Sequence, residues 1–154
     1  MTDQDFGEIY AYETDGMGNY YQIDDANVPS LMSMPYMGYC SVNDPIYQNT
    51  RKWALSKKNP YYFEGTAAKG IGSPHTGDNY IWHIALSIQG MTTDNTAEIE
   101  QILDYFETTD ADTGLVHEGF NKDNPHDFTR PWFSWSNAMF VEFVLSVCGI
   151  RIKM

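Results

Sequence analysis

The stretch IYAYETDGMGNYYQIDDANVPSLMSMPYMGY, residues 9–39, changes character near its middle. Its first half alternates aromatic and polar residues and turns through Asp15–Asn19, where Asp, Gly and Asn accept the backbone conformations of tight turns. We therefore expect a short β-hairpin over residues 9–23. The second half carries apolar residues at helical spacing, which predicts a first helix over residues 26–39.

Three carboxyl or amide side chains lie where the two halves meet: Asp24, Asp25 and Asn27. Burying carboxylates without partners costs free energy, so a cluster at the entrance to a buried helix is expected to make specific contacts. Two interpretations stay open, the binding of sugar hydroxyls and the capping of the helix that follows.

Composition narrows the functional classes. The 154-residue chain is long enough for one domain with a hydrophobic core, and its 15% aromatic content suits a site that stacks on sugar rings as well as ordinary packing. A formal net charge of −12 argues against nucleic-acid and anionic-membrane partners, which require basic patches. A run of about 18 apolar residues is missing, so we expect no membrane-spanning helix. Two cysteines without CxxC spacing are expected to be free buried thiols, which favours a cytoplasmic location.

Four further helices are expected, each from an apolar stripe with a cap or a breaker at its ends. They are predicted at about residues 44–59, 78–90, 95–107 and 131–147. Asp44 is the expected N-cap of the first of them, and Asn95 with Glu98 forms a capping box ahead of the third. Long polar loops at residues 60–77 and 108–130 separate the helices. The sequence therefore predicts an all-α fold of about five helices with one short β-hairpin, the pattern of an α/α toroid or barrel.

The loop at 108–130 contains the string LVHEGF, in which Glu118 has apolar neighbours. A carboxylate in such surroundings is a candidate general acid or base, and a solvated loop glutamate is the alternative. The His-Glu pair is not followed by a second histidine at the spacing of the HExxH zinc motif, so no metal site is expected.

The remaining candidates are less specific. His75 lies in GIGSPHTG, which matches neither a P-loop nor a dinucleotide-binding fingerprint, so no cofactor is expected. Arg130 could bind hydroxyl groups or pair with an acidic neighbour. Trp82, Trp132 and Trp135 could be platforms for sugar rings, although their helical spacing favours a place in the core. From the residues alone, a carbohydrate-acting enzyme with catalytic carboxylates is favoured narrowly.

A set of longer motifs is distributed over residues 6–145: YAYETDGMGNY, DDANVPSLMSMPYMGY, NTRKWALSKKNPYYFEG, GIGSPHTG, YIW, TGLVHEGF and FTRPWFSWSNAMF. Together these motifs resemble the C-terminal portion of glycoside hydrolase family 125, the metal-independent exo-α-1,6-mannosidases. The resemblance implies part of an (α/α)6 barrel, and an enzyme that removes terminal α-1,6-linked mannose from the non-reducing end with inversion and without a metal. Inversion uses two carboxyl groups about 6.5–9.5 Å apart, one as acid and one as base.

The same resemblance assigns roles to residues. Glu118 matches the general base of the family. The residues in motifs around the mannose pocket are Asp24, Asp25, Asn27, His75 and Arg130. The general acid of the family lies upstream of the YAYETDG segment.

Residues 1–154 are therefore expected to be the C-terminal portion of a single barrel domain, inactive in isolation, with α-1,6-linked mannosides as substrates and the N-terminal part of the barrel as a partner. A different α/α-barrel glycosidase and a non-catalytic carbohydrate-binding remnant are the alternatives.

Overall fold

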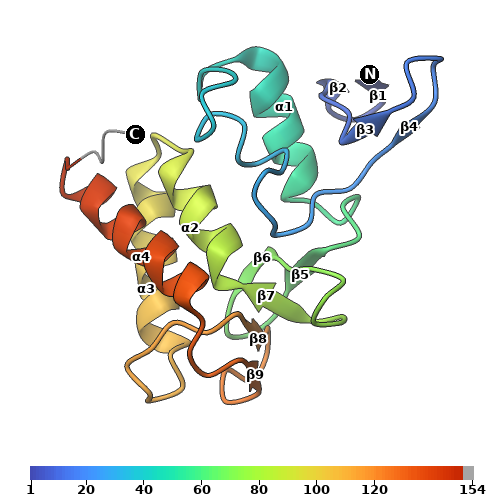
Figure 1. Ribbon diagram of the computed structural model, residues 1–154. Helices are drawn as coiled ribbons and strands as arrows, with labels where there is room; N and C mark the ends of the chain where they lie inside the picture. The colour runs from blue at the N-terminus through green and yellow to red at the C-terminus, as the bar shows by residue number, and fades with distance from the viewer. Residues whose placement is uncertain (151–154) are drawn as a thin grey trace.

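The computed structural model describes residues 1–150, and within them the chain forms four helices and nine short strands (Figure 1). The helices are α1 (Pro45–Ala54), α2 (His83–Met91), α3 (Thr96–Thr108) and α4 (Ser134–Val147). The strands are β1 (Thr2–Asp3), β2 (Gly7–Glu8), β3 (Glu13–Thr14), β4 (Tyr20–Tyr21), β5 (Tyr62–Glu64), β6 (Lys69–Ile71), β7 (Tyr80–Trp82), β8 (Gly119–Asn121) and β9 (Phe128–Thr129). The expectation of an all-α fold is therefore wrong: this chain is a mixed structure of helices and antiparallel sheets.

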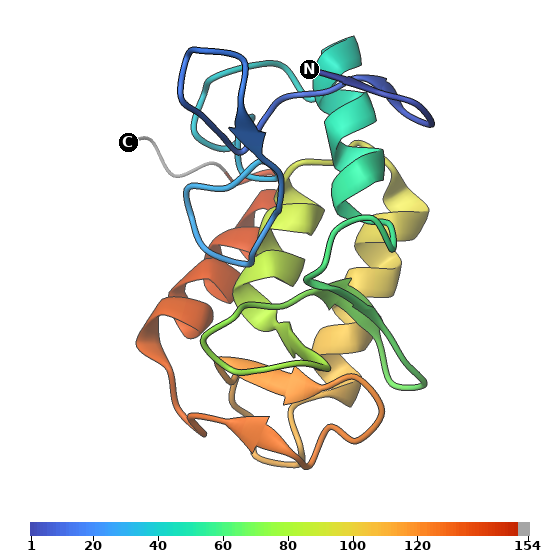
Figure 2. The same cartoon turned by 90° about the vertical axis from the view of Figure 1, so that its right-hand side faces the viewer.

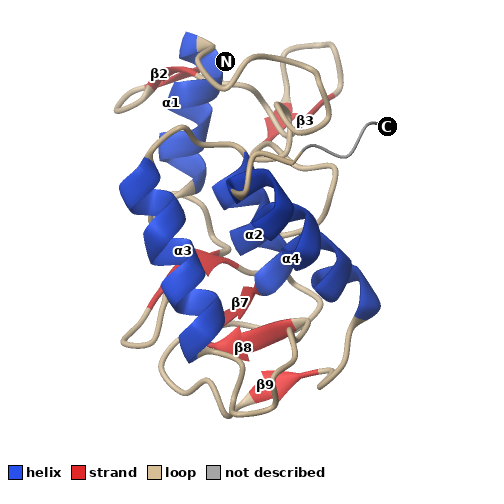
Figure 3. Cartoon of the chain, turned by 90° about the vertical axis from the view of Figure 1, so that its left-hand side faces the viewer, coloured by secondary structure: helices blue, strands red, loops and turns tan. Residues whose placement is uncertain are grey.

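Helix α2 lies at the centre of the molecule. It packs against α4 on one side and α3 on the other, and strand β7 leads directly into its first turn (Figures 1 and 3). Strands β7, β8 and β9 form an antiparallel sheet in that order, with Trp82 opposite Gly119 and Gly119 opposite Thr129. This sheet lies at the opposite end of the molecule from α1 and the N-terminal strands (Figure 2).

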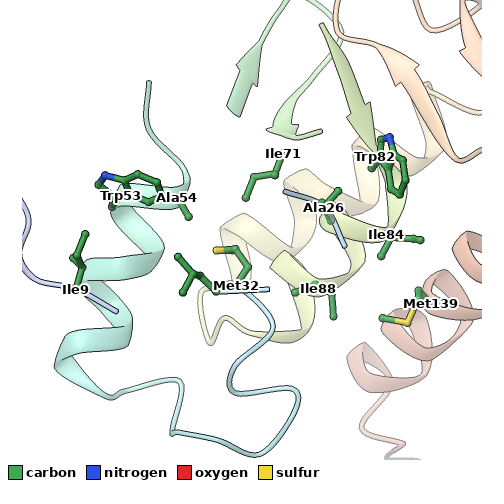
Figure 4. Close-up of a cluster of buried hydrophobic side chains, with 12 residues drawn as sticks. Ile9, Ala26, Met32, Trp53, Ala54, Ile71, Trp82, Ile84, Ile88 and Met139 are labelled. Atoms are coloured by element: carbon green, nitrogen blue, oxygen red, sulfur yellow. The ribbon is translucent and has the colours of Figure 1, made fainter. Parts of the chain in front are cut away.

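The core consists of two clusters of buried apolar side chains that share the central helix. The first cluster joins α1, the 26–32 loop, β6 and one face of α2. Trp53, Met32 and Ile88 are among its members (Figure 4). The second lies between α2, α3, α4 and β8 and includes the fully buried rings of Phe120 and Phe143. Because β8 belongs to this second cluster, the segment that carries Glu118 is fixed to the core.

The segment 26–39 does not form the predicted helix but a series of turns. Pro29 and Pro35 have no N–H to donate. The hydroxyl groups of Ser30 and Ser33 each accept a backbone N–H bond from the other residue, at 3.2 and 2.7 Å. Short polar side chains that bind nearby backbone groups compete with helix formation, and here they prevail over the apolar spacing.

The two predicted loops and the start of the third predicted helix contain strands instead. Residues 60–77 include the antiparallel pair β5 and β6, and residues 108–130 include β8 and β9. Tyr80–Trp82 is extended and pairs with β8, so α2 begins only at His83. These strands are two or three residues long, too short to show an alternating pattern, and the pairing of β7 with β8 joins segments that lie far apart in the chain.

The local helix signals are confirmed. Asp44 accepts a bond from the Tyr47 N–H at 2.8 Å, and Asn95 accepts one from the Ala97 N–H at 3.1 Å. Glu98, however, does not complete a capping box, because its carboxylate binds Arg51 at 2.8 Å. The predicted N-terminal hairpin is present as β3 and β4, turning through Asp15–Asn19.

Helix α4 begins at Ser134, three residues after the predicted start.

Cys40 is partly buried and Cys148 is exposed, so the expectation of two buried thiols is wrong. Among the helices within residues 1–150, none has the length and apolar character needed to cross a membrane.

The contact between α2 and α4 generates a stability prediction. Gly90 faces the ring of Phe143 so closely that an added Cβ would overlap it. Gly90→Ala is expected to lower the free energy of unfolding by about 1–3 kcal/mol through overpacking, although alanine is the better helix former. Urea unfolding followed by circular dichroism measures this difference.

The double variant Gly90→Ala/Phe143→Leu is the control. Its loss of unfolding free energy is expected to be smaller than the sum of the losses in the two single variants, since the smaller side chain removes the overlap. A Gly90→Ala variant as stable as the wild type would contradict this description of the interface.

Candidate active site

Glu118 lies immediately before β8 and is only 7% exposed. Its backbone N–H donates to the Thr129 carbonyl oxygen at 3.3 Å, and the next residue pairs with both neighbouring strands. That residue is Gly119, and a Cβ there would approach Trp82 Cδ1 to 2.8 Å. The absence of a side chain at Gly119 therefore allows the close strand pairing that holds Glu118 in place.

Arg130 pairs with Glu118. Its Nε lies 3.3 Å from Glu118 Oε1, and its guanidinium stands over the Phe133 ring at 5.1 Å from the ring centre. The Arg130 side chain is 63% exposed, whereas that of Glu118 is 9% exposed. Of the two interpretations that the sequence left open for Arg130, the structure shows pairing with an acidic neighbour, and much of the guanidinium remains exposed.

Asp24 serves the architecture of the neighbouring loop. It is 1% exposed, and its Oδ2 accepts a bond from the Met32 N–H at 2.9 Å. Burial, together with the negative charge of Asp25, raises the pKa of Asp24 to about 7. Because no helix follows, Asp24 is not a helix cap, but it does hold a turn of the 24–32 loop.

Asp25 and Asn27 form a second small network in that loop. Asn27 Nδ2 donates to Asp25 Oδ2 at 2.7 Å, and the Tyr12 hydroxyl lies 3.5 Å from Asp25 Oδ1. Asp25 is 6% exposed. Burial and the charge of Asp25 raise the pKa of Tyr12 to about 12, so this hydroxyl remains a donor across the neutral range.

A series of contacts links this loop, through the loop that carries His75 and through Trp82, to the segment that carries Glu118. The Ala26 N–H donates to the Gly72 carbonyl oxygen at 3.0 Å, and Gly72 is followed by the loop with His75. His75 is exposed, and its ring centre lies 6.2 Å from that of Trp82. Trp82 donates from Nε1 to the Thr76 hydroxyl at 2.8 Å and pairs with Gly119, next to Glu118.

The three tryptophans differ in their surroundings. Trp82 is 2% exposed and belongs to the core, as its spacing predicted. Trp132 and Trp135 are 68% and 38% exposed, so a place in the core is wrong for both. Trp132 follows Arg130 by two residues, and its ring is exposed.

Sequence reasoning did not single out Asn137, which supports this site. Asn137 Nδ2 donates to the Val116 carbonyl oxygen at 2.8 Å, two residues before Glu118. The sequence signal that could have identified it is an amide side chain on an otherwise apolar helix. Residues 1–150 contain no group of three or more His, Cys, Asp or Glu side chains that could hold a metal ion. The arrangement offers a carboxylate that can accept a proton, an exposed arginine and an exposed tryptophan.

The model of the family of metal-independent α-mannosidases (GH125) matches residues 1–145. The Schizosaccharomyces pombe meiotically up-regulated gene 157 protein is 47% identical over 143 residues, which are 92% of this chain and 28% of that protein.

A solved metal-independent α-mannosidase from Streptococcus pneumoniae, in a non-productive substrate complex with α-1,6-mannobiose, is 52% identical with a TM-score of 0.93. The match covers 98% of this chain and 35% of that one, so the chain spans about a third of the length of the relatives it matches.

The match of the family model to nearly the whole chain, together with the 52% identity to a solved mannosidase, places the chain among glycoside hydrolase families. The chain belongs to the family of metal-independent α-mannosidases, GH125. The resemblance that the sequence motifs indicated is thereby confirmed.

The burial of Asp24 predicts a pH dependence of stability. The pKa is raised in the folded state from the ordinary value of 3.8 to about 7, so the folded protein binds a proton that the unfolded chain releases. The stabilisation is complete below about pH 4 and is lost as the pH rises toward 7, with an upper bound on the order of 4 kcal/mol.

Asp24→Asn removes this titration. The difference in free energy of unfolding between wild type and Asp24→Asn, measured by urea unfolding from pH 4 to 8, is expected to fall with rising pH and to level off above about pH 7. Asp104→Asn on the exposed face of α3 controls for the loss of one carboxylate from an acidic chain. A difference that does not change with pH would contradict the assignment.

Proposed function

We propose that this chain forms the general-base side of an inverting exo-α-1,6-mannosidase site, in which Glu118 accepts a proton from the attacking water. The observation that carries the proposal is the placement of Glu118: a buried carboxylate, fixed at a strand end and paired with Arg130, within the segment that matches the family. The α-1,6-mannobiose in the complex of the Streptococcus pneumoniae relative supports the choice of substrate.

In an inverting mechanism the base must lie on the face of the sugar opposite the leaving group, with room for one water. Glu118 is held by the backbone bond to Thr129 and by the ion pair, so its carboxylate has a defined direction. Arg130 would bind a sugar hydroxyl while keeping Glu118 oriented, and Trp132 would stack on a ring.

The proposed binding residues for mannose hydroxyls are Asp25, Asn27, His75 and Arg130. Asp24 belongs to the same proposed pocket, with the role of shaping its loop through the bond to Met32. Buried acceptors such as Asp25 suit the hydroxyl groups of a neutral ligand, which can donate to them. A ligand without such donors would leave the buried acceptors unpaired, at a cost in free energy.

The resemblance to the family assigns the general acid to a region upstream of the YAYETDG segment. We therefore propose that the remaining portion of such an enzyme supplies the acid and is a partner of this chain, and that residues 1–154 alone do not turn over substrate. Binding of mannosides without turnover is the second candidate function, which the exposed Trp132 favours.

A chimera tests the proposal. Residues 1–150 replace their counterpart in the solved Streptococcus pneumoniae mannosidase, a substitution that the TM-score of 0.93 supports. The chimera is expected to release mannose from α-1,6-mannobiose with inverted anomeric configuration. NMR spectra recorded during the reaction measure the configuration of the first product formed. Glu118→Gln is expected to lower kcat by at least about 1,000-fold with little change in substrate affinity, because the base acts only in the reaction.

Glu100→Gln, on the exposed face of α3, is the matched control and is expected to keep full activity. The 154-residue chain alone is expected to show no turnover. Retention of the configuration, or a Glu118→Gln chimera with normal kcat, would refute the assignment of the base. A folded chimera that binds mannobiose without hydrolysis would favour the second candidate function.

A further inference from the structure

His117 is a fully buried side chain for which the proposed chemistry has no use. Its ring is 0% exposed and stacks on the Phe128 ring, with centres 3.9 Å apart and planes inclined by 8°. Nδ1 lies 2.9 Å from the Pro131 carbonyl oxygen, and Nε2 lies 3.1 Å from that of Asp110. The ring therefore connects the Glu118 segment to two other parts of the chain, the loop after α3 and the entry to α4.

The contact with Pro131 closes a small ring of interactions. His117 is joined through the chain to Glu118, whose carboxylate pairs with Arg130 Nε at 3.3 Å. Arg130 is joined through the chain to Pro131, whose carbonyl oxygen faces His117 Nδ1. This contact thus joins the chain neighbours of the two ion-pair partners: His117 precedes Glu118, and Pro131 follows Arg130. A shift at His117 would change the distance between the base and the arginine.

The backbone of His117 is held from the other side as well. The ring of His83 lies with Nδ1 3.1 Å from the His117 carbonyl oxygen and with Nε2 2.9 Å from the Thr109 hydroxyl. Burial lowers the pKa of His83 to about 3, so this ring is neutral near pH 7. Since a carbonyl oxygen only accepts, the single proton of the neutral ring is on Nδ1. His83 begins α2, so the His117 backbone is attached to the central helix.

We propose that His117 is a positioning residue for Glu118, acting through the bond from its Nδ1 to the Pro131 carbonyl oxygen. The proposal rests on the proposed role of Glu118 as the general base. Small displacements of a catalytic group lower rates strongly, by about 100-fold for 1 Å, so a bond that fixes the base and its arginine together has a measurable effect on kcat.

Three substitutions separate this bond from the other contacts of the ring. His117→Phe keeps an aromatic ring for Phe128 and removes both nitrogens. In His117→Asn the amide nitrogen takes the place of Nδ1 and can donate to Pro131. In His117→Gln the amide nitrogen reaches instead toward the position of Nε2 and Asp110. The Asn and Gln variants lose the ring equally, so their comparison sets the bond to Pro131 against the contact with Asp110, and His117→Phe shows the loss of both.

The first measurement uses the 154-residue chain and does not depend on activity. The Nε–H signal of Arg130 in ¹H–¹⁵N spectra, assigned with Arg130→Lys, reports the ion pair. Its exchange with water is expected to be at least about threefold faster in His117→Phe and His117→Gln than in the wild type, and close to wild type in His117→Asn. Circular dichroism confirms that each variant is folded.

The second measurement uses the active chimera described above. His117→Phe and His117→Gln are expected to lower kcat by about 10-fold or more with KM changed less than about threefold, and His117→Asn to recover most of the loss. A merely structural role would lower stability in all three variants without separating Asn from Gln.

Equal behaviour of the Asn and Gln variants, or wild-type values in His117→Phe, overturns the positioning role. If Glu118→Gln leaves turnover unchanged, the proposed function fails. The Arg130 signal still decides whether His117 holds the ion pair, so the two failures are distinguishable.

Discussion

The backbone pairing of Trp82 with Gly119 is the contact on which the rest of the structure depends. Trp82 ends strand β7, and the next residue begins the central helix, so this pair joins the core to the segment that carries Glu118. The pairing is close because Gly119 has no side chain to meet the Trp82 ring. The side chain of Trp82 contacts the His75 loop, and its backbone pairs with the strand beside the candidate base.

Charge is accommodated differently at the buried carboxylates of this acidic chain. Asp24 has a backbone N–H as its partner, and burial raises its pKa to about 7, so the neutral form dominates in mildly acidic solution. Glu118 has Arg130 as its partner, and the partly buried Glu98 has Arg51. Burial without a cation favours the protonated form of Asp24. At Glu98 burial acts in the same direction, but the charge of Arg51 and hydrogen bonds outweigh it and lower the pKa.

The sequence predicted those elements whose signals are local. Asp44 and Asn95 cap α1 and α3 because a cap requires only a side-chain acceptor two or three residues before the amide it binds. The predictions for 26–39 and for the two long loops failed for different reasons. In 26–39, serine hydroxyls replaced helical bonds. In the loops, the strands are only two or three residues long, too short to show an alternating pattern, and β8 also pairs with β7, which lies far along the chain.

By itself the sequence determined the family, the Glu118 candidate and the caps of two helices, because each depends on residue types at fixed spacing along the chain. Only the tertiary structure decided that Arg130 pairs with Glu118, that Asp24 is buried in its own loop, and that Trp132 is exposed while Trp82 is not. Burial and ion pairing depend on which distant segments meet. The β7–β8–β9 sheet brings these segments together through backbone hydrogen bonds, which nearly all residue types can make.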